Sequence, residues 1–135
     1  MTGIENFLGK WMFIPERAAY EFGPPPKSGT YEILQDGQTL MFNIAWVDDK
    51  GEAQAVSYAE VCDGEFHDYP VKQAADEICL SLKHAALLES EARKGGRVVL
   101  SAKRELVSED EMKVTMSGDR PDGSPYRNVS WYVRI

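Results

Sequence analysis

The amino-acid sequence predicts an all-β protein, a closed antiparallel up-and-down β-barrel of about ten strands with at most a short N-terminal helix. First, short segments of alternating apolar and polar residues follow one another at a spacing of roughly 8–14 residues. Second, turn signals that contain Gly separate these segments, and third, hardly any stretch has helical periodicity. Closure is expected because an open sheet of this size would leave the backbone of two long edge strands unpaired.

The first elements expected along the chain are a short helical lead-in and a strand. Thr2 is a candidate N-cap for a helix over residues 2–8, because an acid stands at the third position after it. Trp11 and Phe13 then share one side of an extended segment. Residues 15–22 fit a helical turn, and the three consecutive prolines that follow predict a stiff connector on the surface.

From residue 29 onward the sequence predicts one hairpin after another. The strongest strand covers residues 39–47, where Leu40, Phe42 and further large apolar residues share one face. Residues 53–61 form the next strand, and its face of small residues would leave empty volume in the core if it pointed inward. The other strands are expected over residues 31–35, 65–71, 78–82, 87–93, 97–107, 112–116 and 128–135.

Size and charge limit the possible functions. The chain has 135 residues, 43% of them hydrophobic, which suits one domain over residues 1–135 with a single core. With 22 acidic against 15 basic side chains, the net charge of −7 disfavours nucleic acid and anionic membranes as partners. No apolar run approaches the ~20 residues that span a bilayer, and no secretion signal is visible, so the cytoplasm is the expected location.

The residue types that usually carry catalysis or bind metals form no motif. Cys62 and Cys79 have no second Cys or His at ligand spacing, so free thiols are expected. The two histidines, His67 and His84, also lack a second ligand at a suitable spacing. Because no nucleophile motif appears either, we predict no catalytic residues, no metal site and no cofactor.

A set of motifs covers nearly the full length of the chain. They are Gly9-Lys10-Trp11, Gly23-Pro24-Pro25-Pro26-Lys27-Ser28, Val47-Asp48-Asp49-Lys50-Gly51, Ser57-Tyr58, Asp63-Gly64, Tyr69-Pro70, Gly96-Arg97-Val98-Val99 and Asn128-Val129-Ser130-Trp131-Tyr132. Together they resemble the calycins, the superfamily of lipocalins and fatty-acid-binding proteins, and are more similar still to uncharacterised bacterial lipocalin-like proteins. The resemblance implies an antiparallel barrel around a pocket for a small, mostly apolar molecule, and for the bacterial group it implies no known activity.

The chain departs from its better-known relatives on the last strand. Fatty-acid-binding proteins hold the lipid carboxylate with an Arg and a Tyr two residues apart, whereas here Ser130 stands two residues before Tyr132. Arg134 could take the place of that Arg, or it could cover Trp11 as a lipocalin arginine covers its tryptophan. The resemblance therefore implies a structural role in barrel closure for Gly9, Trp11 and Arg134.

The orientation of the last strand is open at this stage. The resemblance to fatty-acid-binding proteins puts Tyr132 inward. Simple alternation instead puts the other face inward, namely Val129, Trp131, Val133 and Ile135. If both faces are apolar and buried, one of them packs on the N-terminal segment or on a second subunit, so a homodimer is possible.

Arg104 is the most informative charge in the sequence. It is in register with Leu100 and Ala102 on the apolar face of a long strand, and a buried guanidinium needs a partner. That partner could be a ligand carboxylate, an internal acid or water at the strand end. The residues predicted to bind a ligand are Tyr58, Arg104, Tyr132, Trp46 and His67.

The function expected from these observations is binding of a small apolar or amphipathic molecule inside the barrel, with the ligand unknown. Two alternatives remain open. One is an enzyme that uses the barrel pocket, either an isomerase or a haem-dependent catalyst with His67 and Tyr69. The other is a protein-interaction module that uses residues 24–26 or an outer face of the sheet.

Overall fold

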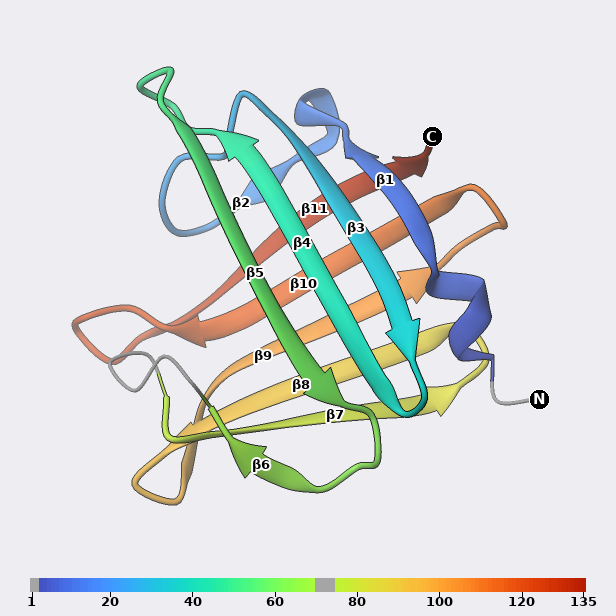
Figure 1. Ribbon diagram of the computed structural model, residues 1–135. Helices are drawn as coiled ribbons and strands as arrows, with labels where there is room; N and C mark the ends of the chain where they lie inside the picture. Colours follow the sequence, from blue (N-terminus) through green and yellow to red (C-terminus); the bar gives the residue numbers. More distant parts are fainter. Residues whose placement is uncertain (1–2, 70–74) are drawn as a thin grey trace.

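The computed structural model describes residues 3–69 and 75–135, which form one antiparallel sheet curled into a barrel (Figure 1). The strands are β1 (Gly9–Phe13), β2 (Ala19–Tyr20), β3 (Ser28–Asp36), β4 (Thr39–Val47), β5 (Ala53–Val61), β6 (Phe66–Asp68), β7 (Glu77–His84), β8 (Leu87–Lys94), β9 (Arg97–Leu106), β10 (Glu111–Asp119) and β11 (Pro125–Arg134). Two 3₁₀ helices, η1 (Ile4–Phe7) and η2 (Pro15–Arg17), flank β1. No helix in the described part of the chain is long and apolar enough to cross a bilayer.

The first and last strands of the chain, β1 and β11, lie side by side. The strand order is β5-β4-β3-β1-β11-β10-β9-β8-β7-β6, and β2 pairs with β11 off this path. β1 stands between its two neighbours, with Trp11 opposite Tyr31 on β3 and opposite Arg134 on β11. The prediction of an all-β, up-and-down antiparallel barrel is confirmed.

The barrel is nearly closed, and one seam separates its two sheet edges. These edges are β5 and β6, so the seam lies in the middle of the chain and not between its ends. Cys62, just after β5, forms an isolated parallel bridge with Leu80 of β7. The backbone N–H of Gly64 also donates to the Leu80 carbonyl at 3.0 Å. The seam is therefore held at one end, next to the turn that leads from β5 to β6.

The N-terminal helix closes one end of the barrel. It is a single 3₁₀ turn, η1, and the predicted cap Thr2 lies outside the described residues. Gly3 precedes η1 with φ of 94°, and a Cβ there would approach the Ala85 Cα to 2.7 Å, so η1 packs tightly on the β7–β8 turn. Phe7 is fully buried, and its carbonyl accepts a hydrogen bond from the Trp11 indole at 3.0 Å.

The solid part of the core lies behind η1. It consists of side chains from the helix and from the strand ends nearest to it, among them Ile4, Phe7, Trp11, Ile33, Leu40, Phe42, Leu80, Leu88 and Met112. Burial of these large apolar side chains is the main stabilising contribution expected in a barrel of this size. Because this cluster fills only one end, the other end of the barrel remains free for a cavity.

The buried Leu40 and Phe42 share the inward face of β4, and the small residues of β5 lie on its outer face. Tyr58 lies opposite Phe42 in the β4–β5 register, and residues directly opposite in an antiparallel pair point to the same face. Since Phe42 is fully buried, Val56 and Tyr58 point inward. The small residues are exposed on the outside, namely Ala53, Ala55, Ser57 and Ala59.

The pairing of β11 with β10 fixes which face of the last strand points inward. Tyr132 lies opposite Met112, which is fully buried, so Tyr132 and Ser130 point inward. The prediction from simple alternation, with Trp131 inward, is wrong. Trp131 is stabilised on the outside by the Arg17 guanidinium, whose Cζ lies 3.9 Å from the indole ring centroid.

Candidate functional site

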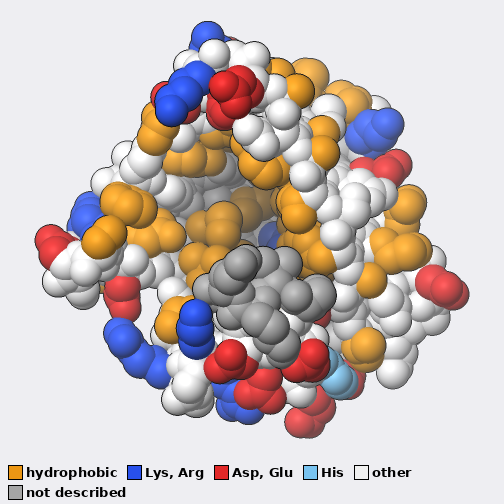
Figure 2. Space-filling model, turned by 60° about the vertical axis from the view of Figure 1, so that its left-hand side comes forward, with side chains coloured by type: hydrophobic (Ala, Val, Ile, Leu, Met, Phe, Trp, Pro, Cys, Tyr) orange, Lys and Arg blue, Asp and Glu red, His pale blue; other side chains and the backbone are white. Residues whose placement is uncertain are grey.

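The end of the barrel opposite η1 contains a cavity of about 460 Å³. Figure 2 shows a hollow in the surface with hydrophobic side chains around it. Its wall is mainly apolar and includes Phe13, Ile44, Trp46, Val56, Tyr58, Ile78, Leu100, Ala102, Val114, Met116 and Tyr132. The size and the apolar lining are those of a small-molecule site in proteins generally.

Pro26 also lines this cavity, at the end of the proline run that connects β2 to β3. Pro24 and Pro25 are exposed. The stiff connector predicted from the sequence therefore lies beside the cavity, where its fixed backbone forms part of the rim.

Arg104 lies in the cavity wall on β9 and is 4% exposed. Its Nε donates to the Tyr31 hydroxyl at 2.8 Å, and a terminal nitrogen donates to the Ser90 hydroxyl at 3.1 Å. Among the described residues no carboxylate forms an ion pair with this guanidinium. Since arginine keeps its charge and has five N–H donors, Arg104 is a buried cation whose hydrogen-bond acceptors in the described structure are neutral hydroxyls.

Aromatic rings surround this cation on two sides. The Arg104 Cζ lies 4.9 Å from the centroid of Phe42, whose ring stacks on Tyr58 with 5.0 Å between centroids. Tyr31 packs edge-on against Tyr132 at 5.5 Å. Burial raises the pKa of Tyr58 and of Tyr132, so both phenols are neutral and can donate or accept a hydrogen bond. The site thus combines one positive charge with an apolar, aromatic surface.

The structure brings four of the five predicted ligand-binding residues together around the cavity. Tyr58, Arg104, Tyr132 and Trp46 all contribute to its wall. His67 is not among the residues that line the cavity. It lies on β6 at the seam, with its side chain 40% exposed and its Nε2 2.9 Å from a carboxylate oxygen of Asp63.

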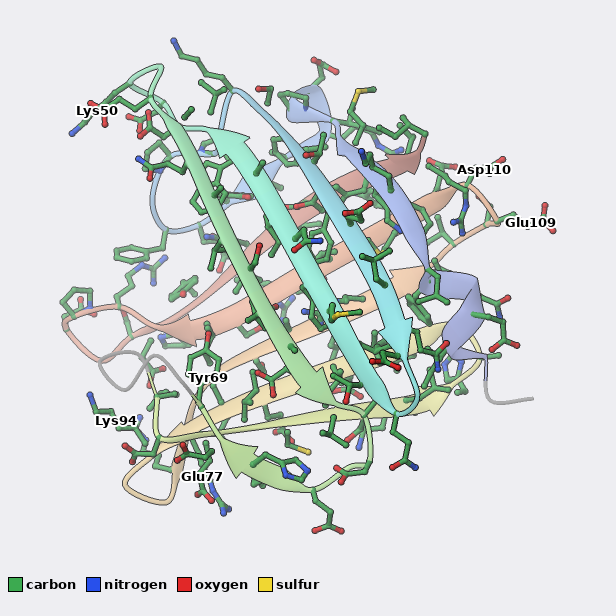
Figure 3. The ribbon with its side chains drawn as sticks, viewed as in Figure 1. Lys50, Tyr69, Glu77, Lys94, Glu109 and Asp110 are labelled. Atoms are coloured by element: carbon green, nitrogen blue, oxygen red, sulfur yellow. The ribbon has the colours of Figure 1, made fainter. Side chains whose placement is uncertain are left out.

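The residues considered for an enzyme are therefore separated. Tyr69 lines the cavity and is labelled in Figure 3, whereas His67 is held at the seam by Asp63. Within the described residues, no three His, Cys, Asp or Glu side chains gather into a group that could hold a metal ion.

The residues predicted to close the barrel lie together, away from the cavity. Arg134 covers the Trp11 ring with its Cζ 4.2 Å from the centroid. Its terminal nitrogens donate to the Leu8 carbonyl at 2.6 Å and to the Asn6 carbonyl at 2.8 Å. Gly9 has a φ of 120°, and a Cβ there would approach an Arg134 nitrogen to 3.0 Å, so the close contact favours glycine.

Glu60 is an interior polar residue that the sequence patterns did not predict. It follows Val56 and Tyr58 on the inward face of β5 and is 5% exposed, and its Oε1 has no hydrogen-bond partner in the described structure. Burial raises the pKa of this carboxyl from 4.5 to about 7, although the charges of His67 and Arg104 oppose the rise. The signal in the sequence was its place two residues after Tyr58, on the same face of the strand.

Comparisons with known proteins identify the fold. No family model matches the sequence, and no curated protein has a matching sequence. The zebrafish ileal bile acid-binding protein, solved in complex with cholic acid, aligns with a TM-score of 0.60 and 15% identity over 96% of this chain and 99% of its own. A redesigned β-barrel aligns with a TM-score of 0.55 and 12% identity over 97% of this chain and 93% of its own.

A siderocalin, Ex-FABP, aligns with a TM-score of 0.49 and 11% identity over 96% of this chain and 74% of its own. At such identities the similarity concerns the fold alone. The chain has the calycin barrel fold, as the resemblance of its sequence motifs implied.

Proposed function

We propose that this protein binds one small amphipathic molecule in the barrel, with the apolar body of the ligand in the cavity and an anionic end at Arg104. The observation that supports this most is a mainly apolar cavity of about 460 Å³ whose wall contains a buried guanidinium. The zebrafish neighbour was solved with cholic acid, which is an anionic amphiphile, and this agrees with the proposed ligand class.

Burial of the Arg104 charge costs free energy unless a partner compensates it. Arg104 is removed from water, and its partners among the described residues are neutral hydroxyl groups and aromatic rings. A carboxylate or sulfonate would provide charge-assisted hydrogen bonds, which are roughly twice as strong as neutral ones. The apolar body of the ligand would gain about 25 cal/mol for each Å² that it buries against the aromatic wall.

Two matched probes test this proposal. Decane-1-sulfonate has an ionised head group, and decan-1-ol has the same chain with a neutral one. Calorimetric titration of the intact protein is expected to show binding of both probes. Arg104→Leu should lower the affinity for the sulfonate by more than about tenfold and the affinity for the alcohol far less. Equal sulfonate affinity of the unmodified protein and Arg104→Leu would show that Arg104 does not bind the anionic group. If neither probe binds, the proposal is contradicted.

Native mass spectrometry of the protein as purified provides an independent measurement. A bound small molecule that is released on denaturation would support a carrier role, and its mass would identify its class. Lys103→Leu serves as a matched control for Arg104→Leu, because it also replaces a cation of β9 by leucine, but Lys103 is exposed and does not line the cavity. We expect that variant to keep most of the sulfonate affinity.

A further inference from the structure

Two opposite charges are buried in the interior of this barrel without touching each other. Arg104 is 4% exposed and Glu60 is 5% exposed, yet no ion pair joins them in the described structure. We infer that Glu60 takes up a proton when an anionic ligand binds at Arg104, so that such ligands bind more tightly below neutral pH than above it. This inference rests on the proposed function and adds a proton to the ligand-binding reaction.

The surroundings of Glu60 favour it as the group that takes up the proton. It lies on β5 beside the seam, opposite the fully buried Leu40 of β4. The polar groups that act on it are His67 from β6 and Arg104 from β9, and Tyr69, which follows β6, is affected by its charge. None of them satisfies Oε1, which is buried without a hydrogen-bond partner in the described part of the chain. An ionised carboxylate in this place is therefore poorly stabilised.

The charge balance of the interior gives the direction of the coupling. With Glu60 protonated, Arg104 leaves a net charge of about +1 inside the barrel, and an anionic ligand brings it to about zero. With Glu60 ionised, the interior is already neutral, and the same ligand adds an uncompensated negative charge. The ligand therefore binds preferentially to the protein with Glu60 protonated.

Linkage then requires the reverse effect. If protonation of Glu60 strengthens anion binding, anion binding must raise the proton affinity of Glu60 by the same factor. Because burial already raises the pKa of Glu60 to about 7, the proton exchanges near neutral pH. A neutral ligand changes no charge, and its affinity should not depend on this proton.

His67 is the competing source of such a pH dependence. A protonated imidazole at this position would add positive charge at the seam, as Arg104 does in the interior. It is 40% exposed and paired with Asp63, so its charge is better screened than that of Glu60. A His67→Asn variant separates the two groups.

The experiment measures the dissociation constants of decane-1-sulfonate and decan-1-ol by calorimetry between about pH 5.5 and 8.5. The sulfonate stays ionised over this range. For the unmodified protein we expect its dissociation constant to rise about tenfold or more across the range, while the value for the alcohol stays flat. Glu60→Gln should give a flat sulfonate profile, and His67→Asn should keep the slope of the unmodified protein.

The outcomes distinguish this inference from the proposed function. Sulfonate binding with no pH dependence, an unchanged slope in Glu60→Gln or a lost slope in His67→Asn would each overturn the role of Glu60 and leave the carrier function intact. Binding of neither probe would overturn both. If Glu60→Gln does not fold, the Glu60 carboxyl resonance of the unmodified protein can be titrated by ¹³C NMR with and without sulfonate, and its midpoint should move to higher pH on binding.

Discussion

Replacement of Glu60 by Gln is expected to change the pH dependence of stability even without a ligand. The pKa of Glu60 rises from 4.5 to about 7 in the folded protein because the carboxyl is buried. Since a tenfold change in acid dissociation corresponds to about 1.4 kcal/mol, this rise corresponds to a destabilisation of about 3 kcal/mol when the group is fully ionised.

The sign follows from proton binding. Between pH 4.5 and about 7 the folded protein holds the Glu60 proton and the unfolded chain has lost it, so the free energy of unfolding falls as pH rises through this window. Below this window Glu60 is protonated in both the folded and the unfolded protein, so its burial does not lower the free energy of unfolding. Above this window Glu60 is ionised in both states, so the full decrease in unfolding free energy remains and does not grow with pH.

The assay is urea denaturation of both proteins at a series of pH values from about 4.5 to 8. The difference in unfolding free energy between Glu60→Gln and the unmodified protein should shift in favour of the variant by about 3 kcal/mol across the window. Glu109→Gln is the matched control, because Glu109 is exposed in the β9–β10 turn (Figure 3). Parallel curves for Glu60→Gln and the unmodified protein would refute the account of a buried, proton-retaining Glu60.

Two further predictions concern the closed end and the cavity. Arg134→Ala removes the hydrogen bonds to Leu8 and Asn6 and the cover over Trp11, so it should lower the unfolding free energy by about 2–4 kcal/mol in urea denaturation, with sulfonate affinity nearly unchanged. A loss below about 0.5 kcal/mol would show that Arg134 does not stabilise the barrel end. Ala102→Phe places a ring in the cavity and should weaken sulfonate binding at least about tenfold in calorimetry, and unchanged affinity would place the ligand elsewhere.

The sequence was sufficient to predict where the strands lie, but not which face of each strand points into the barrel. Alternation and Gly-containing turns are local signals, so β4 was predicted at residues 39–47, where the structure has it. The inward face of β5 depends on its pairing with β4, which puts Tyr58 beside Phe42. The outward position of Trp131 depends on Arg17, a contact between residues far apart in the chain, and no local pattern reports it.

Local patterns in the sequence also predicted part of the candidate site. Arg104 stood out as a charge on an apolar face, and the structure has it buried in the cavity wall. Glu60 was not identified because an acid near the end of a strand is usually solvated. Its burial follows from the position of the seam between β5 and β6, which is a property of the whole barrel. His67 lies at that seam for the same reason.

The most direct test of the carrier function is a crystal structure of the protein soaked with decane-1-sulfonate at about pH 6, where the proton-linked form dominates. The sulfonate oxygens are expected within hydrogen-bonding distance of the Arg104 guanidinium, with the alkyl chain along the aromatic wall of the cavity. A cavity that contains only water at saturating sulfonate, or a sulfonate bound on the outer surface alone, would contradict the proposed function.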